Sequence, residues 1–213
     1  MSIETFNSFL KKYKDKKLVI TTHRHPDVDG IASMYALGQF LENSIYALQD
    51  NPSEDTHPLI EKLGMEFQFL RDLKKEDYDG LIVFDCHSYV LVTDAKGWNL
   101  VLIIDHHQDE SKNMHAEFEI IRNDSPSNVE VIYELLPKID KKTAYALAVG
   151  IISDTARFKS AKASTFEKLS RLIELSGVSY KELFDCAYPQ EPMDKRMAVL
   201  TALQRVETIE YKG

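Results

Sequence analysis

The chain has 213 residues, a formal net charge of -8 and an isoelectric point near 5.4. Its hydrophobic content of 44% is ordinary for a globular protein, and its length is sufficient to bury a substantial core. The acidic balance argues against unspecific binding of long nucleic acids, which requires a basic surface. Two cysteines outside any CxxC motif exclude a disulfide framework. No apolar run approaches the roughly 18 residues of a membrane span, so we expect a soluble, cytoplasmic protein.

Apolar patterns predict alternating helices and strands in the first part of the chain, residues 1–125. The predicted helices cover 3–15, 30–42 and 58–64, and the predicted strands cover 18–22, 44–48, 80–85 and 99–105. The strands are apolar throughout rather than alternating, which is typical of a parallel sheet covered on both faces. Over 126–213 the apolar residues recur every three to four positions, which indicates mainly helical structure. We therefore expect one α/β domain over residues 1–213, with a Rossmann-like, mostly parallel β-sheet flanked by helices and a helical C-terminal portion.

Histidines and aspartates follow three of the predicted strands directly. The first strand leads into HRHPDVD, the strand GLIVF leads into Asp85, and the strand NLVLII leads into DHH. The carboxyl ends of parallel strands meet at one edge of a sheet, where ligands bind in such folds. We therefore expect a single cluster of side chains, formed by His23, Asp27, Asp29, Asp85, Asp105, His106 and His107.

Carboxylates gathered at one edge repel one another, which disfavours their charged forms and raises their pKa values. Within these motifs Arg24 is the only lysine or arginine, so a pair of divalent cations would relieve the repulsion. Imidazole and carboxylate ligands without cysteine suit manganese, iron or zinc better than calcium. Two such ions, about 3.5–4 Å apart and sharing one aspartate, would generate hydroxide from a bridging water, polarise a phosphoryl oxygen and stabilise the leaving oxygen. This chemistry is the hydrolysis of a phosphoester or phosphoanhydride.

A further motif follows the apolar segment LAVGIIS. Asp154 could complete the ligands of the second ion. Arg157 could hold a phosphate oxygen, because the guanidinium matches that geometry. The alternative for Arg157 is an ordinary surface charge.

In chain order, HRHPDVD, FDC, DHH and SDT resemble the four motifs of the DHH phosphoesterase superfamily. This superfamily includes RecJ-like exonucleases, oligoribonucleases that also act on 3′-phosphoadenosine phosphate, cyclic-dinucleotide phosphodiesterases and manganese-dependent (family II) inorganic pyrophosphatases. The resemblance spans roughly residues 18–160. The leading His-x-x-Pro-Asp is closer to the oligoribonuclease and pyrophosphatase branches than to the RecJ branch.

The resemblance implies a role for each matched residue. It implies that His23 and Asp27 bind a first ion, that Asp29, His106 and Asp154 bind a second, and that Asp85 bridges both. It also implies that His107 faces the substrate phosphate as an acid or an electrostatic stabiliser, and that Asp105 orients the histidine pair from behind the metal ligands. Two manganese ions are the implied cofactors, with Mg²⁺, Co²⁺ or Zn²⁺ as alternatives.

Other residues near the motifs are candidates for substrate contacts or supporting roles. They are Arg24, His25, His87 and Ser127. His25 could be an additional ligand, a substrate contact or simply exposed, and the role of His87 stays open. The segment NDSPSN, residues 123–128, could form a helix N-terminus that holds an anion, or a solvated loop.

Most phosphoesterases of this superfamily carry a second domain, called DHHA1, with a glycine-rich GGGH-like motif that holds substrate. We expect no such domain in these 213 residues, which contain no Gly-Gly pair and no basic Arg-Lys-Lys cluster like that of the pyrophosphatases. The alternatives are a stand-alone domain, a truncated chain, or a subunit whose partner, a second copy or another protein, supplies the second half.

Three functions remain open. The first is a manganese-dependent phosphodiesterase or phosphomonoesterase for short oligonucleotides or small nucleotides, in which metal-bridged hydroxide is the nucleophile and His107, Asp85 and Arg157 are catalytic. The second is a manganese-dependent inorganic pyrophosphatase, which the missing basic cluster disfavours. The third is a metal-binding DHH subunit that needs a partner for activity, which the complete set of expected ligands disfavours.

Overall fold

The computed structural model describes residues 2–108, 112–190 and 193–207. Its centre is a six-stranded, entirely parallel sheet in the order β3-β2-β1-β4-β5-β6. The strands are β1 (Leu18–Thr22), β2 (Ser44–Leu48), β3 (Gln68–Phe69), β4 (Gly80–Phe84), β5 (Leu100–Asp105) and β6 (Phe118–Ile121). This is the Rossmann strand order, which has its topological switch point between β1 and β4. The predicted fold class is confirmed.

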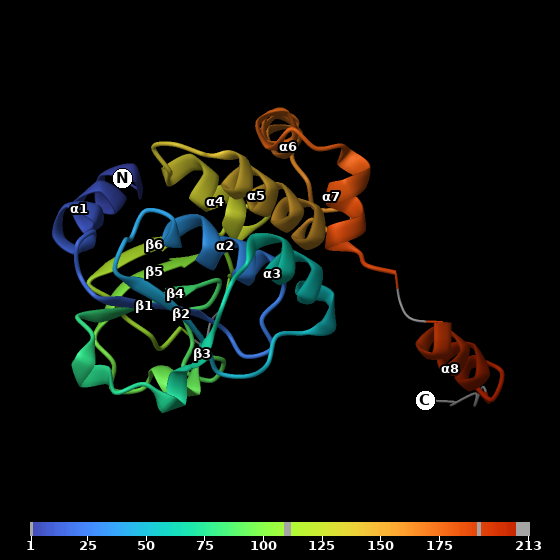
Figure 1. Cartoon of the computed structure of the whole chain (residues 1–213), viewed down its shortest axis with the longest axis horizontal. Helices are drawn as coiled ribbons and strands as arrows, with labels where there is room; N and C mark the ends of the chain where they lie inside the picture. Colours follow the sequence, from blue (N-terminus) through green and yellow to red (C-terminus); the bar gives the residue numbers. More distant parts are fainter. Residues whose placement is uncertain (1, 109–111, 191–192, 208–213) are drawn as a thin grey trace, which may run out of the picture.

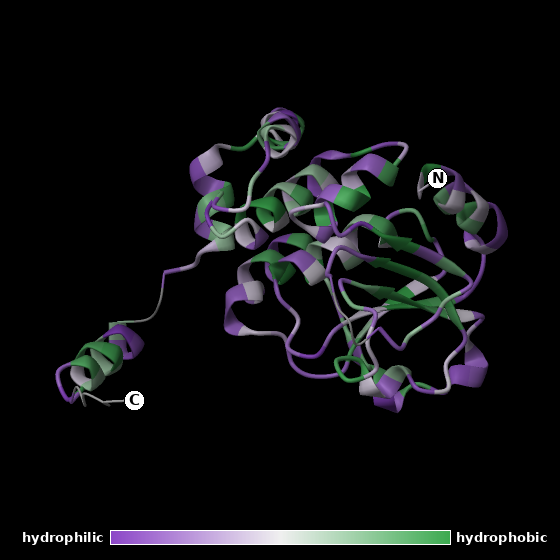
Figure 2. Cartoon of the chain, turned by 180° about the vertical axis from the view of Figure 1, so that it is seen from behind, coloured by the Kyte–Doolittle hydropathy of each residue, from purple (hydrophilic) through white to green (hydrophobic). Residues whose placement is uncertain are grey.

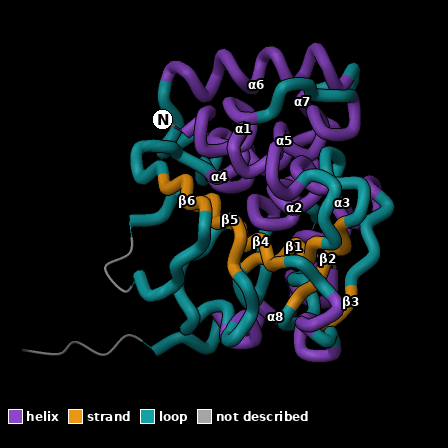
Figure 3. The backbone as a smooth tube through the Cα atoms, turned by 90° about the vertical axis from the view of Figure 1, so that its left-hand side faces the viewer, coloured by secondary structure: helices purple, strands orange, loops and turns teal. Residues whose placement is uncertain are grey.

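The helices gather mainly on one face of the sheet (Figures 1 and 3). They are α1 (Ser2–Tyr13), α2 (Val28–Gly38), α3 (His57–Leu63), α4 (Asn128–Leu135), α5 (Lys141–Asp154), α6 (Ala163–Ser176), α7 (Tyr180–Ala187) and α8 (Met193–Leu203). Helices α6 and α7 pack against α5 and form an outer layer. On the opposite face the sheet is covered by loops and short 3₁₀ turns such as Leu70–Asp72 and Thr93–Ala95.

The central strands are buried along their whole length. Every residue of β1, β4 and β5 is buried, and Figure 2 shows these strands at the hydrophobic end of the scale. Alternate side chains of a strand point to opposite faces. Ile20 therefore joins the core beneath the helices, and its neighbour Val19 joins the core beneath the loops. The uniformly apolar strands of the sequence are thus explained by coverage on both faces.

The start of α2 lies unusually close to the end of β1. The Asp27 side chain caps the helix by accepting a hydrogen bond from the Gly30 amide at 2.9 Å. A Cβ at position 30 would lie 2.6 Å from Thr22 Oγ1, so only glycine permits this approach. The close packing brings the first turn of α2, with Asp29, to the carboxyl edge of the sheet.

Helix α5 lies in the middle of the helical side of the molecule. It is capped by the Asp140 side chain, which accepts from the Thr143 amide at 2.7 Å, and its residues 143–152 are all buried. It packs against α2 on one side and against α6 and α7 on the other. It ends at Asp154, which it carries to the same edge as the strand ends.

Helix α8 lies apart from the body (Figures 1 and 2). Its apolar side chains, among them Met197 and Leu200, are exposed, and Lys195 Nζ lies 3.5 Å from Glu54 Oε2. The helical character predicted for 126–213 is found in α4 to α8. That residues 1–213 form one domain stays a prediction. Throughout the described ranges, no helix is long and apolar enough to cross a bilayer.

Candidate metal centre

The residues predicted to converge do so at the switch point of the sheet. His23 directly follows β1, and Asp85 directly follows β4. Asp105 ends β5 and is followed by His106 and His107. Asp27 and Asp29 lie at the start of α2, and Asp154 ends α5. The carboxyl ends of three strands and the termini of two helices therefore meet at one place.

Asp85 joins two groups of potential metal ligands. In the first group, His23 Nε2 lies 3.8 Å from Asp27 Oδ1 and 3.6 Å from Asp85 Oδ2. In the second, His106 Nε2 lies 3.8 Å from Asp29 Oδ2, 3.5 Å from Asp154 Oδ2 and 3.3 Å from Asp85 Oδ1. The two oxygens of Asp85 thus face different histidines.

The turn after β4 fixes this shared carboxylate. Asp85 has a φ of 58°, in the left-handed region that a residue with a Cβ seldom adopts. Its amide donates to Ile104 O at 2.9 Å, which ties the turn to β5. Strained backbone of this kind persists where the surrounding structure enforces it, often at functional sites.

The donor atoms fit a divalent cation. Among the residues that the structure describes, Asp85 Oδ1 and His106 Nε2 are buried yet have no hydrogen-bond partner. Leaving buried polar atoms without a hydrogen bond is costly, and a cation between these two atoms, which lie 3.3 Å apart, would satisfy both. Nitrogen and carboxylate oxygen atoms within 4.8 Å of one another suit manganese and similar ions.

The carboxylates of the site raise the pKa values of His23 and His106 and so favour protonated imidazoles. Burial favours neutral imidazole, but the carboxylates of Asp27 and Asp85 outweigh it and raise the pKa of His23 to about 10. In the same way burial is outweighed by Asp85, which raises the pKa of His106 to about 9. Burial and the Asp85 charge raise the pKa of Asp154 to about 6.

The pKa values of two buried aspartates, Asp29 and Asp85, shift in opposite directions. Burial, followed by the negative charge of Asp85, raises the pKa of Asp29 well above its usual value. Burial also opposes ionisation of Asp85, but the nearby imidazoles of His106 and His23 outweigh it and lower the Asp85 pKa. Asp85 therefore stays charged beside the two histidines.

Asp105 holds the histidine pair from behind. Its Oδ1 accepts hydrogen bonds from the His106 amide at 2.7 Å, the His107 amide at 3.0 Å and His107 Nδ1 at 2.9 Å. Its Oδ2 is paired with Nδ1 of the buried His87. Burial raises the pKa of Asp105, but the hydrogen bonds from His107 outweigh it and lower that pKa. The side chain of His107 is 53% exposed, which leaves its Nε2 available to a substrate.

The remaining predicted residues lie outside the two ligand groups. Arg24 and His25 are exposed. Ser127 is buried at the N-terminus of α4, but the amides of Asn128 and Val129 donate to the Asp29 carboxylate at 2.7 and 2.9 Å. These two N–H groups therefore hold a carboxylate of the chain itself and not an external anion, which was one of the two alternatives for NDSPSN.

Arg157 lines a second hollow beside the ligand groups rather than the ligand groups themselves. The first hollow, of about 290 Å³, is lined by residues that include His23, Asp85 and His107. The second, of about 440 Å³, contains Arg157, and Asp27 borders both. No motif indicated the lining residues Ser53, Asp55, Phe184 and Tyr188, which come from segments far apart in the sequence.

Comparisons with known proteins agree with this geometry. The family model described as "DHH family, N-terminal domain" matches residues 17–151. An uncharacterized protein of Methanocaldococcus jannaschii is 32% identical, over 95% of this chain and 64% of its own length. A probable manganese-dependent inorganic pyrophosphatase of Streptococcus equi subsp. equi is 27% identical, over 78% of this chain and 58% of its own length.

A solved structure has the same fold. The crystal structure of an exopolyphosphatase-related protein from Bacteroides fragilis superimposes with a TM-score of 0.80 at 17% identity, over 98% of this chain and 66% of that one. The chain thus spans less than two thirds of the length of each of these three proteins. The match over residues 17–151 identifies the chain as a member of the DHH family.

Proposed function

We propose that the chain is a metal-dependent phosphohydrolase that uses two divalent cations, preferably manganese, to hydrolyse phosphoester bonds of short oligonucleotides or small nucleotides. The main support is the position of Asp85, whose two oxygens lie 3.6 Å from His23 and 3.3 Å from His106. A carboxylate shared by two groups of ligands is typical of two-metal hydrolases. Membership of the DHH family supports the same class of reaction.

In this proposal each ligand group holds one cation. The first is held by His23, Asp27 and Asp85, and the second by Asp29, His106, Asp154 and Asp85. When bound, the two ions would supply a nucleophile from water at neutral pH and neutralise charge on the phosphoryl oxygens.

The chain itself contributes positioning and proton transfer. Asp105 fixes His107 through Nδ1, and the raised pKa of His107, caused mainly by that hydrogen bond, favours a protonated ring. A protonated His107 can stabilise the phosphate charge or give its Nε2 proton to the leaving oxygen. Arg157, in the adjoining hollow, is suited to bind a further phosphate oxygen.

Hydrolysis of inorganic pyrophosphate is the first alternative, because one relative is described as a probable pyrophosphatase. Pyrophosphate is small and highly charged, so its binding calls for several cationic side chains. Among the described residues that line the two hollows, Arg157 is the only lysine or arginine. This scarcity favours a substrate with further groups to bind.

A second alternative is a metal-binding subunit whose partner supplies the substrate-binding half. It is supported by the lengths of the relatives, of which the chain spans 58% and 64%. In that case the purified chain would bind manganese and hydrolyse little.

A panel of substrates tests the proposal. Purified protein with Mn²⁺ is assayed side by side against dinucleotides, 3′-phosphoadenosine phosphate, pyrophosphate and polyphosphate. We expect manganese-stimulated hydrolysis of a nucleotide substrate that exceeds hydrolysis of pyrophosphate. A preference for pyrophosphate would establish the first alternative, and manganese binding without hydrolysis of any substrate would favour the second.

A further inference from the structure

The second hollow borders the metal centre and has a chemically distinct lining. Its volume is about 440 Å³, and its lining includes Asp27, Ser53, Asp55, Arg157, Phe184 and Tyr188. Asp27 is at the same time a proposed metal ligand and part of the first hollow. A molecule in this hollow would therefore be continuous with a phosphate at the metal centre.

One wall of the hollow is aromatic and fixed in place. The Tyr188 hydroxyl donates to the carbonyl oxygens of Ile152 and Ser153, at 3.1 Å each, and so ties the ring to the end of α5. The Phe184 ring packs against it with 5.1 Å between the centroids. Both side chains are partly exposed. An immobile, partly exposed aromatic wall is the kind of surface on which a nucleobase stacks.

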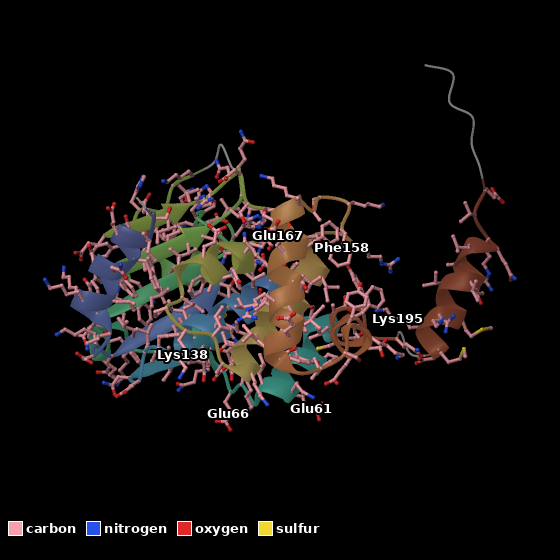
Figure 4. All side chains as sticks on the ribbon, turned by 90° about the horizontal axis from the view of Figure 1, so that it is seen from above. Glu61, Glu66, Lys138, Phe158, Glu167 and Lys195 are labelled. Carbon is pink, nitrogen blue, oxygen red and sulfur yellow. The ribbon has the colours of Figure 1, made fainter. Side chains whose placement is uncertain are left out.

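The aromatic contacts continue away from the hollow. Tyr180 lies 5.9 Å from Phe184, and Phe158 lies 6.3 Å from Tyr180 between ring centroids. Figure 4 shows Phe158 beside α6, on the side of the body toward α8. Tyr180 does not line the hollow, so it provides a matched aromatic position for a control.

The positively charged side chain of Arg157 lies beside the aromatic wall. The Arg157 guanidinium lies 4.9 Å from the centroid of the Tyr188 ring, and the residue is exposed. Residues Ala156, Arg157 and Phe158 have φ values of 48°, 59° and 69° in succession. Three residues with a Cβ in the left-handed region make a strained turn, and this turn holds Arg157 beside Tyr188.

The hollow also has a polar part to its lining. Ser53 and Asp55 come from the segment that leads into α3, and both are exposed. Hydroxyl and carboxylate oxygens accept hydrogen bonds from sugar hydroxyls, and an acidic residue has this role in other Rossmann-like nucleotide sites. The hollow thus offers separate surfaces for a flat ring, for hydroxyls and for a phosphate.

From these observations we propose that the second hollow is a nucleoside subsite. The base stacks on Phe184 and Tyr188, the sugar hydroxyls contact Asp55 and Ser53, and Arg157 binds a phosphate oxygen of the same nucleotide. The inference rests on the proposed function for the position of the scissile phosphate at the metal centre. Inorganic pyrophosphate has neither base nor sugar and would leave the hollow unused.

Binding measurements test the subsite without relying on hydrolysis. The dissociation constants of adenosine 5′-monophosphate and inorganic phosphate are measured by calorimetry with the manganese-loaded full chain. We expect the wild type to bind the nucleotide at least about tenfold more tightly than phosphate, since stacking of one base contributes on that order. We expect Tyr188→Leu to remove most of this preference and to change phosphate affinity by less than about twofold.

Two further variants sharpen the comparison. Tyr188→Phe keeps the ring and should keep the preference, whereas Tyr180→Leu removes a ring outside the hollow and should also keep it. Equal affinity of the wild type for nucleotide and phosphate would overturn the subsite, as would a parallel loss of both affinities in Tyr188→Leu. If the protein preferred the nucleotide but hydrolysed no substrate, the subsite would be supported and the proposed function contradicted. If it hydrolysed phosphoesters but bound nucleotide no better than phosphate, the proposed function would be supported and the subsite contradicted.

Discussion

The buried imidazole of His87 is hydrogen-bonded through Nδ1 to Asp105 Oδ2, while Asp105 Oδ1 accepts from His107 Nδ1 at 2.9 Å. One carboxylate therefore links His87, a buried residue that lines the first hollow, to the half-exposed His107 of the candidate metal centre. Mutating a partner that orients residues of a metal site typically costs about 10- to 100-fold in metal affinity or activity. This relationship assigns a positioning role to His87.

We predict that His87→Leu lowers kcat at least about tenfold while the protein still binds two manganese ions per chain. The reason is that Asp105 loses the donor that fixes one of its oxygens, so His107 is held less well. His87→Asn offers an amide donor near the position of Nδ1 and should restore most of the lost kcat. Metal content by elemental analysis and steady-state kinetics check this. If the Asn variant were as impaired as the Leu variant, the role of His87 would be packing alone.

We predict that Asp85→Asn abolishes hydrolysis and leaves the fold intact. The amide keeps the shape of the side chain but removes the charge that both ligand groups share. Bound manganese should fall from about two ions per chain to less than one, and circular dichroism should be unchanged. Asp185→Asn, an exposed aspartate paired with Lys181 on α7, is the matched control. Manganese-stimulated activity of Asp85→Asn near the wild-type rate would contradict the two-metal assignment.

Much of the centre could be predicted from the sequence, because a buried parallel strand must end at the carboxyl edge of its sheet. Asp85 and Asp105 follow apolar runs, and both line the first hollow. Strands β3 and β6 could not be predicted in this way. The first has two residues, and the second is an edge strand whose residues are mostly half-buried, so neither forms a uniformly apolar run.

Contacts between distant segments could not be predicted from the sequence either. Asp29 caps α4 through the amide of Asn128, which is 99 residues further along the chain. The nucleoside subsite combines Asp55 with Tyr188, and no motif marks either residue. The role of His87 stayed open for the same reason, since its partner Asp105 belongs to another strand end. Such pairings follow from the packing of whole elements, which local patterns do not encode.

We predict that the metal-free protein loses stability as the pH rises from about 6.5 to 9. His23 and His106 have folded pKa values of about 10 and about 9, above the unfolded value near 6.5. Within this window the folded state keeps protons that the unfolded state releases. The free energy of unfolding therefore falls by up to about 1.4 kcal/mol per pH unit for each proton. The raised pKa of Asp29 acts in the same direction.

Chemical denaturation in EDTA and in saturating Mn²⁺ checks the pH prediction. Manganese replaces the protons on the imidazoles, so the loaded protein should be nearly insensitive to pH over the same window. Manganese binding at pH 7 should also release protons, which calorimetry in buffers of different ionisation enthalpy measures. A metal-free protein equally stable at pH 6.5 and 9 would show that the imidazoles are not held protonated by Asp85.

We predict that Gly30→Ala weakens manganese binding although residue 30 binds no metal. The new Cβ would lie 2.6 Å from Thr22 Oγ1, so the start of α2 must move away from β1. Thr22 cannot easily yield, because its hydroxyl donates to Phe84 O at 2.9 Å, next to Asp85. The shift displaces Asp27 and Asp29, and we expect the manganese dissociation constant to rise about tenfold or more.

A second substitution separates displacement of α2 from a general loss of stability. Thr22→Ala removes Oγ1 and Cγ2, the two atoms nearest to the new Cβ, and leaves Thr22 Cβ at 3.3 Å. The double variant Gly30→Ala, Thr22→Ala should therefore regain manganese affinity relative to Gly30→Ala alone. Gly177→Ala is a suitable control, because its Cβ would meet nothing within 4 Å and its φ of 71° confines the cost to backbone strain far from the centre. The Gly177→Ala variant should have a lower thermal stability and an unchanged manganese affinity. If Gly30→Ala also kept its affinity, close packing of α2 on β1 would not be what positions the aspartates.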